Sequence, residues 1–435
     1  MRHALVVVTL VVLPLAAQTN RIDTISPMAP ELAAYGSHAV GVRTVTVTDR
    51  NRPDVLNTVE GGPIARYDRA LTLEVWYPAA LEPGQAPGGA YRGVITRDPA
   101  VIVTLHGRAV RDAAPARGPF PLIVISHGYP GNRYLMSHLG ENLASKGYVA
   151  ASIDHRDSTY DDQKAFSSTL YNRPYDQLFV VNELARLGAA GSAHILDGLV
   201  DGSRVGLVGY SMGGYGVINV IGGGYSAASV TRSGAPPNRM LEARTAAAPS
   251  YRDSIDVRIK AAVAIAPWGM QVGFWDADGL AGIRTPLLVV AGSVDDVAGY
   301  EKGPRAIWEG AVNAERYLLT FLNANHNAAA PIPAPAETWG TNGDRPAAFA
   351  HYADAVWDTV RMNNILAHFA TAFFDHYVKG EAAARDYLAL VPHGKDGVWA
   401  MDREGRPQPA HTYWKGFRRG TAVGLSFEKR DPDRR

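Results

Sequence analysis

One stretch near the middle of the chain places a strand, a sharp turn and a helix in direct succession. Residues 204–210 form an apolar run typical of a buried strand, which leads into Gly209-Tyr-Ser-Met-Gly-Gly214 and the helix-compatible residues 215–220. Glycines on both sides of Ser211 remove the Cβ atoms that would collide in so tight a turn. The stretch therefore predicts a strand–turn–helix unit that exposes the Ser211 hydroxyl at the end of a strand.

Strand-like and helix-like patterns alternate along much of the chain. Apolar residues repeat with helical spacing over residues 135–143, over 178–185 with Pro174 at the helix entry, and over 365–377. Such alternation is typical of βαβ units, so we expect an α/β fold with a mostly parallel central sheet flanked by helices. The first two strands alternate in polarity, which favours antiparallel edge strands. The expected strands cover residues 42–48, 71–76, 101–105, 121–126, 148–154, 204–210, 259–266, 286–291 and 317–322.

Four segments do not follow this alternation. Residues 79–118 are rich in Gly, Pro and Ala, which indicates a long surface connection. Residues 222–256 separate the helix after Ser211 from the next strand, and an insertion of that length is often a lid. Residues 328–350 contain several prolines and are expected to form a rim, and residues 396–428 are expected to add a small C-terminal β extension.

The N-terminal residues indicate an exported protein. A basic start, an apolar run and Pro14-Leu-Ala-Ala17 predict a signal peptide over residues 1–18, cleaved near Ala17 or Gln18, and a secreted or periplasmic enzyme. The run is shorter than the roughly 20 residues that cross a bilayer, so no stable membrane anchor is expected. We expect residues 19–435 to form one domain, with its core at about 40–380.

Composition excludes several classes of function. The 43 basic and 42 acidic residues give a formal charge of +1, which offers no electrostatic reason to bind nucleic acid. The chain has no cysteine, which excludes disulfides and a thiol nucleophile. Asp154, Asp157, Asp161 and Asp162 match no known metal-binding loop, and neither a metal nor another cofactor is expected. The oligomeric state is left open.

A serine nucleophile requires a basic histidine and a carboxylate that holds the histidine in the correct tautomer. When the nucleophile lies on a strand-to-helix turn of this kind, the order along the chain is Ser, then Asp or Glu, then His. Asp295 follows the strand at 286–291 with the Gly-x-x-Asp spacing of that turn, which favours Asp295 over its neighbour Asp296. His326 follows the next strand. The expected catalytic residues are therefore Ser211, Asp295 and His326.

The oxyanion of a tetrahedral intermediate needs two N–H donors. Met212 is expected to supply the first, directly after the nucleophile at the helix start. Tyr129 is expected to supply the second, because the strand at 121–126 leads into a His-Gly pair immediately before it and a helical pattern after it. The other His-Gly pair, at 106–107, is not followed by a clear helix. His127 is expected to fix the loop through hydrogen bonds.

Several segments resemble two related groups of α/β-hydrolases. The first group contains platelet-activating-factor acetylhydrolases and predicted bacterial dienelactone hydrolases. The segments similar to this group are residues 73–79, 120–128, 143–148 and 153–157. Those similar to the bacterial cutinase-like polyester hydrolases are residues 209–214, 266–268, 285–290 and 325–326.

The resemblance covers about residues 40–330 and implies an α/β-hydrolase that cleaves carboxylic esters. It also implies that Tyr129 and Met212 are the oxyanion donors and that Trp268 lines the acyl pocket. The chain departs from the animal acetylhydrolases, which carry their acid where this chain has Ala266-Pro267, so the acid is expected at Asp295. It departs from true dienelactone hydrolases in having no cysteine.

The sequence thus predicts a secreted serine hydrolase that cleaves a small-molecule or polymeric ester through an acyl-Ser211 intermediate. Tyr129, Trp268, Phe274 and Trp275 are candidates for aromatic pocket walls, with ordinary core packing as the alternative. Three alternatives stay open: a cutinase-like polyester hydrolase, a peptidase or amidase on the same fold, and a catalytically silent binding protein. The intact set of Ser, Asp and His argues against the last.

Overall fold

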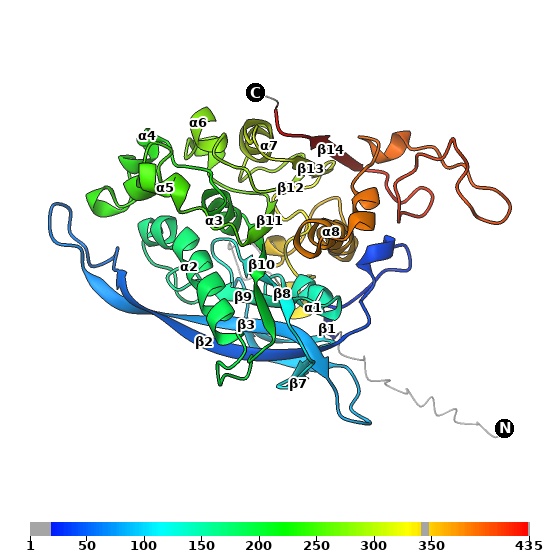
Figure 1. The fold of residues 1–435 in the computed structure, drawn as a ribbon, viewed down its shortest axis with the longest axis horizontal. Coiled ribbons are helices and arrows are strands. Elements are labelled where there is room, and N and C mark those ends of the chain that lie inside the picture. The colour runs from blue at the N-terminus through cyan, green and yellow to red at the C-terminus, as the bar shows by residue number, and fades with distance from the viewer. Residues whose placement is uncertain (1–18, 341–347, 434–435) are drawn as a thin grey trace, which may run out of the picture.

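The computed structural model describes residues 19–340 and 348–433, so the signal peptide expected at residues 1–18 lies outside the described residues. The described part folds around a central sheet of eleven strands, in the order β14-β13-β12-β11-β10-β8-β9-β3-β2-β6, with β7 paired beside β3 (Figure 1). The strands of this sheet are β2 (Ala39–Pro53), β3 (Arg66–Ala80), β6 (Val110–Arg111), β7 (Ala114–Pro115), β8 (Phe120–Ser126), β9 (Val149–Asp154), β10 (Val200–Tyr210), β11 (Ile259–Ile265), β12 (Leu287–Gly292), β13 (Arg316–Phe321) and β14 (Leu425–Arg430).

The centre of the sheet is parallel. Strands β9, β8, β10, β11, β12 and β13 each run parallel to their neighbours in this series. The two long strands β2 and β3 and the last strand β14 pair antiparallel at either side. The predicted mostly parallel α/β sheet with antiparallel first strands is therefore confirmed.

Helices cover both faces of the sheet because alternate strand residues point to opposite sides. On β8, Ile123 and Ile125 pack into the same apolar layer as helices α1 (Ser137–Ser145) and α8 (Thr359–Phe374). Leu122 and Val124 pack into the other layer, with α2 (Phe166–Leu187) and α3 (Met212–Val220). Figure 1 shows the two helix pairs on opposite sides of the strands. The remaining α-helices are short: α4 (Ala227–Val230), α5 (Pro249–Asp253), α6 (Ala277–Leu280) and α7 (Ala306–Gly310).

Residues 79–118 are more than the surface connection that their composition indicates. They contain β4 (Gly89–Ile95) and β5 (Ile102–Gly107), which form a separate three-stranded sheet with β1 (Asn20–Arg21). The strand expected at 101–105 thus exists, but outside the central sheet. Tyr91 and Leu105 are buried against the main core, and this burial orders a segment rich in glycine and proline.

Pro174 lies inside α2 and does not mark the helix entry. A proline cannot donate to the carbonyl four residues earlier, which is that of Leu170. The Tyr215 hydroxyl of α3 donates to this carbonyl at 3.1 Å. The unpaired carbonyl is therefore satisfied by tertiary structure, which no helix-end rule applied to the sequence can anticipate.

The insertion at 222–256 packs against the helix that follows the nucleophile. Tyr225 stacks on Tyr215 of α3 with ring centroids 5.5 Å apart, and the Tyr251 hydroxyl donates to the carbonyl of Asn219. These contacts fix the insertion on the outer side of α3.

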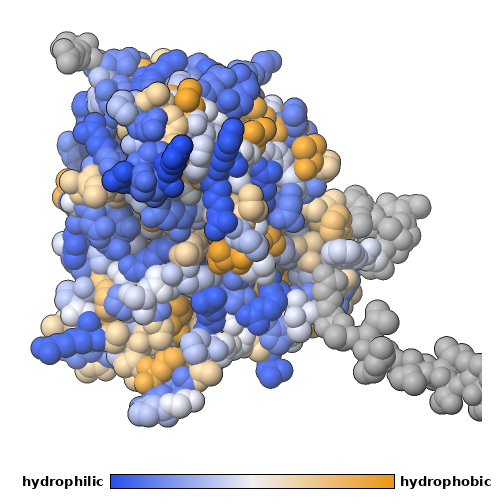
Figure 2. All heavy atoms as spheres, turned by 90° about the vertical axis from the view of Figure 1, so that its right-hand side faces the viewer, coloured by the Kyte–Doolittle hydropathy of each residue, from blue (hydrophilic) through white to orange (hydrophobic). Residues whose placement is uncertain are grey.

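The C-terminal segment completes the sheet. β14 pairs with β13 at the sheet edge, and Trp414 and Phe417 are buried against Phe369 of α8. The expected β extension at 396–428 is therefore one edge strand preceded by loops. Figure 2 shows that this side of the molecule is mainly hydrophilic with scattered hydrophobic residues. No helix within residues 19–340 and 348–433 is long and apolar enough to cross a membrane.

Candidate active site

Ser211 occupies a strained turn between β10 and α3. Its backbone has φ 52° and ψ −113°, a region that residues with a Cβ rarely adopt. A Cβ at Gly209 would lie 2.3 Å from the carbonyl oxygen of Gly213, and one at Gly213 would lie 2.0 Å from that of Ser126. The two glycines therefore permit the close backbone contacts that the turn requires.

Ser211, His326 and Asp295 form a continuous hydrogen-bonded chain. His326 Nε2 lies 2.9 Å from Ser211 Oγ, and His326 Nδ1 lies 2.9 Å from Asp295 Oδ2. A carboxylate only accepts, so Nδ1 carries the proton and Nε2 is free to accept the serine proton. Asp295 follows β12 and His326 follows β13, and these neighbouring parallel strands bring both side chains to the same edge of the sheet.

The structure distinguishes the two adjacent carboxylates. Asp295 is buried, and its Oδ1 accepts the backbone N–H groups of Val297 and Ala298 at 2.9 and 2.8 Å. Asp296 is exposed and faces the cavity in front of the serine. Among the hydrogen bonds and ion pairs of the described residues, His326 has its carboxylate contacts with Asp295 and none with Asp296.

Two backbone N–H groups beside Ser211 are free to bind an anion. Within the described residues, neither the Tyr129 nor the Met212 N–H donates a hydrogen bond. The carbonyl of Ser211 accepts from the N–H groups of Tyr215 and Trp268 at 2.9 and 3.2 Å. Because the C=O and N–H of a trans peptide point in opposite directions, these two bonds aim the Met212 N–H away from α3. The pair has the chemistry of an oxyanion hole.

His127 fixes the loop that carries Tyr129. Its Nε2 accepts the backbone N–H of His155 at 3.2 Å, so its Nδ1 is protonated and donates to the carbonyl of Gly128 at 2.7 Å. Burial lowers the pKa of His127 well below its usual value, so the ring stays neutral. Both ring nitrogens are engaged with backbone, as expected for a structural histidine.

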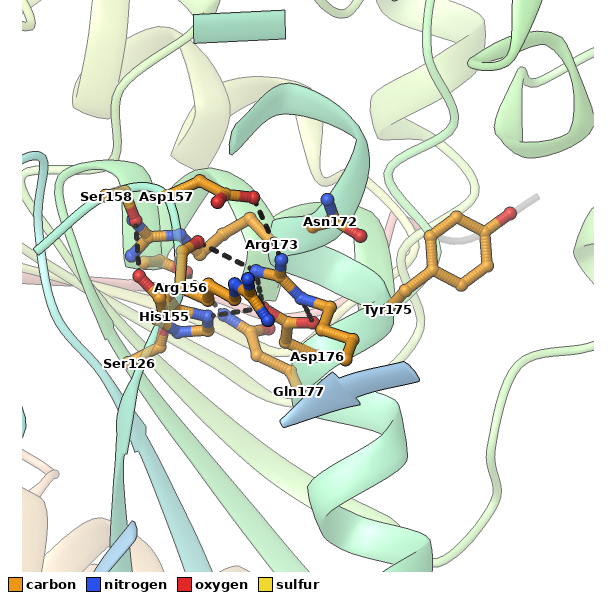
Figure 3. A network of polar contacts seen from close by, with 12 residues as sticks. Ser126, His155, Arg156, Asp157, Ser158, Asn172, Arg173, Tyr175, Asp176 and Gln177 are labelled. Atoms are coloured by element: carbon orange, nitrogen blue, oxygen red, sulfur yellow. Dashed lines mark hydrogen bonds and ion pairs between the residues drawn. The ribbon is translucent and has the colours of Figure 1, made fainter. Parts of the chain in front are cut away.

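A second serine, histidine and aspartate are connected in the same way as the first set. His155 Nε2 lies 2.8 Å from Ser126 Oγ, and His155 Nδ1 lies 3.0 Å from Asp176 Oδ2 (Figure 3). All three side chains are buried, and Ser126 is 0% exposed within strand β8. No substrate can reach this hydroxyl, so the second set supports the structure and does not catalyse.

A cavity of about 730 Å³ opens in front of Ser211. The lining includes the expected Tyr129, Ser211 and His326 and their neighbours Tyr210, Asp296, Val297, Asn325 and Asn327. Its other walls come from two segments, and only the second was expected, as the rim at 328–350. These wall residues are Arg97, Asp98, Pro99, Val101, Glu337, Thr338, Gly340, Ala348, Ala350 and His351. Burial lowers the pKa of His351 to about 3, so it is a neutral wall residue. The rim expected at 328–350 is therefore present among its described residues.

Several expected wall residues lie elsewhere. The Trp268 ring is outside the cavity lining and packs against Phe166 and Tyr215, and its link to the site is the backbone N–H that binds Ser211. Phe274 and Trp275 are core residues, 0% and 2% exposed. None of the residues of 222–256 lines the cavity, and Tyr225 is buried in the same apolar cluster as α3. A lid role for this segment stays a prediction.

The described residues include no group of three or more His, Asp or Glu side chains arranged to hold a metal ion.

This sheet, with a serine on a strained turn and its acid and base after the following strands, is the α/β-hydrolase fold. The structure of a ferulic acid esterase from Streptomyces cinnamoneus superposes with a TM-score of 0.55 at 22% identity, covering 88% of this chain and 98% of that one. The sequence model of a family described as PET hydrolase-like (PETase) matches residues 89–233.

Similar sequences are those of cutinases and related enzymes. The chain is 22% identical to a cutinase (est1) of Thermobifida alba over 47% of its own length and 53% of the relative's. It is 25% identical to a bis(hydroxyethyl) terephthalate hydrolase of Streptomyces coelicolor over 48% and 51% of the two lengths. The chain thus spans about half the length of these curated relatives, and the expected similarity to cutinase-like α/β-hydrolases is confirmed.

Proposed function

We propose that this protein is a serine hydrolase that cleaves carboxylic esters. The observation that supports this most strongly is the Ser211–His326–Asp295 chain, with both links at 2.9 Å, opening on a large cavity beside two unpaired N–H groups. These are the parts that acyl transfer needs: a nucleophile, a base with a fixed tautomer, and donors for the oxyanion.

In the proposed reaction, Ser211 Oγ attacks the ester carbonyl carbon while its proton passes to His326 Nε2. The carbonyl oxygen becomes an oxyanion and accepts the N–H groups of Tyr129 and Met212. The intermediate collapses as His326 protonates the departing alkoxide, which leaves as an alcohol. Water then attacks the acyl-serine with His326 as base, releasing the acid and restoring the serine. Asp295 stabilises the imidazolium in both steps.

We further propose that the protein is exported through residues 1–18, since their pattern is that of a secretory signal. Finding the mature N-terminus of the secreted enzyme near residue 18 would support export. Retention of the full chain inside the cell would contradict it.

Labelling with a fluorophosphonate tests the nucleophile. The folded protein should form one adduct, located on Ser211, and the Ser211→Ala variant should form none. Hydrolysis of acetyl, butyryl and long-chain nitrophenyl esters, with an aminoacyl anilide as the amide comparison, then tests the substrate class. Absence of labelling, or cleavage of the anilide alone, would contradict the esterase proposal.

Polyester hydrolysis is the second candidate, because two of the similar proteins are named a cutinase and a bis(hydroxyethyl) terephthalate hydrolase. Release of soluble acid from an aliphatic or aromatic polyester film, compared with turnover of a soluble diester of the same acid, separates the two activities. Turnover of the diester without release from either film would restrict the enzyme to small esters.

A further inference from the structure

Helix α2 places a buried cation directly behind residues 127–129, the segment that carries the Tyr129 N–H and is here called the oxyanion loop. Arg173 is 1% exposed, and its guanidinium donates to the carbonyls of His127 and Gly128 and, at 2.7 Å, to Ser158 Oγ. All three acceptors are neutral. Burial lowers the pKa of Arg173 to about 9, so the group remains protonated at neutral pH.

The nearest carboxylate on the same helix is already occupied. Asp176 accepts two hydrogen bonds from Arg69, at 2.8 and 2.9 Å, and one from His155. Figure 3 shows this network on the side of α2 that faces the strands. Within the described residues Arg173 forms no ion pair of its own. Its direct partners are carbonyl and hydroxyl dipoles, and the charge of Asp176 acts on it without a direct contact. A buried, unpaired guanidinium is costly to fold, which argues that it has a task beyond packing.

The contact with Gly128 connects Arg173 to catalysis. The peptide between Gly128 and Tyr129 is trans, so a partner that holds its C=O also sets the direction of the Tyr129 N–H. That carbonyl is held from two sides, by His127 Nδ1–H at 2.7 Å and by Arg173 at 3.4 Å. Gln177, one turn further along α2, donates to the carbonyl of Gly213 at 3.0 Å. This bond links α2 to the turn that carries Met212, the other oxyanion donor.

Resting on the proposed hydrolase function, we propose that Arg173 is a positioning residue for the oxyanion hole. Its guanidinium holds the carbonyls of His127 and Gly128 so that the Tyr129 N–H is fixed toward the substrate's oxyanion. The charge behind the peptide also polarises it, which strengthens the Tyr129 N–H as a donor. Among the described contacts Arg173 has none with Ser211, and it does not line the cavity.

The Arg173→Met variant tests this role. It should lower kcat by roughly 10- to 100-fold, because removal of one oxyanion donor costs about 100- to 1,000-fold and here the donor stays but is misaligned. KM should change less than about 2-fold, since an ester carbonyl gains little from the hole before it becomes an oxyanion. Affinity for a phenylboronic acid, which forms a tetrahedral anionic adduct, should fall in parallel with kcat. Arg173→Lys keeps the charge and should retain an intermediate kcat.

Arg316 offers a control with the same burial. It is also 1% exposed and donates to the backbone carbonyls of Val312, Ala314 and Asp431, at the end of β13 opposite to the one that leads to His326. Unlike Arg173 it also pairs with a carboxylate, that of Asp433 at 3.1 Å. Arg316→Met should lower the unfolding temperature but leave kcat and boronate affinity per folded molecule unchanged.

The outcomes separate this inference from the proposed function. Inactivity of the wild-type enzyme on all esters would refute the ester-hydrolase proposal itself. An active wild type with kcat and boronate affinity of Arg173→Met within 2-fold of it would overturn the positioning role alone. If neither Arg173 variant folds while Arg316→Met does, the positioning role is also overturned, because the guanidinium is then needed for the fold.

Discussion

The substitution Asp295→Asn separates the two neighbouring carboxylates by a defined geometric mechanism. Oδ1 of Asp295 accepts two backbone N–H groups, from Val297 and Ala298. His326 Nδ1 lies 2.9 Å from Oδ2, which accepts from no other described group, and 3.0 Å from Oδ1. In the variant, the amide oxygen should stay with the two N–H donors, which turns the amide NH2 toward His326. That NH2 can only donate, so Nδ1 must accept and the ring proton moves to Nε2. His326 then cannot take the proton of Ser211.

A wrong histidine tautomer of this kind lowers kcat by about 10,000-fold, equivalent to about 5 kcal/mol of transition-state stabilisation. We expect that loss in Asp295→Asn, measured with a nitrophenyl ester under saturating substrate. The KM should stay within about 3-fold, because Asp295 does not line the cavity.

Asp296→Asn is the matched control, with the same change of charge one residue away. Asp296 lies in the cavity wall and is exposed, so the kcat of the Asp296→Asn enzyme should differ from that of the wild type by less than about 3-fold. If Asp295→Asn retains more than a tenth of the wild-type kcat, Asp295 is not the catalytic acid. The same follows if Asp296→Asn loses more kcat than Asp295→Asn does.

Three further predictions concern the turn and the core. Ser211→Gly should be more stable to urea than Ser211→Ala by about 1 kcal/mol, because glycine adopts the strained φ of 52° without penalty; equal stabilities would contradict this. Gly213→Ala should lower kcat at least 10-fold and the stability by about 1–3 kcal/mol, since its Cβ would meet the Ser126 carbonyl at 2.0 Å; a wild-type unfolding midpoint would argue otherwise. His138 and His368 have pKa values lowered to about 3 by burial, against about 6.5 unfolded, so the unfolded chain binds more protons between these values. Stability should therefore fall as the pH drops from 6.5 toward 3, by about 1.4 kcal/mol per pH unit for each histidine. Urea titrations at several pH values should show a shallower slope for His138→Phe, and an unchanged slope would count against the assignment.

Local signals account for what could be predicted of the site. Ser211 and its glycines lie within one short stretch, so the strained turn can be inferred from the residues that form it. Asp295 and His326 each follow a recognisable strand, and parallel neighbours bring their carboxyl ends to the same edge of a sheet. The structure places these side chains within hydrogen-bond distance.

Contacts between segments far apart in the chain could not be predicted from the sequence. Pro174 resembles a helix start until the Tyr215 hydroxyl is seen to satisfy the freed carbonyl. Trp268 was expected to line a pocket, but its ring joins an aromatic cluster and its backbone N–H reaches the serine. The segment 222–256 has the length of a lid, yet its tyrosines are buried against α3.

By itself, the sequence determined the parallel α/β sheet, the strained turn at Ser211 and the order of the serine, acid and base, because hydrophobic periodicity and turn chemistry are properties of consecutive residues. Only the tertiary structure decided the cavity wall at 97–101, the outward position of 222–256 and the contact of Arg173 with the oxyanion loop. These features depend on which segments pack against one another when the helices cover the two faces of the sheet. Such packing is set by the burial of side chains far apart in the chain, which no local pattern records.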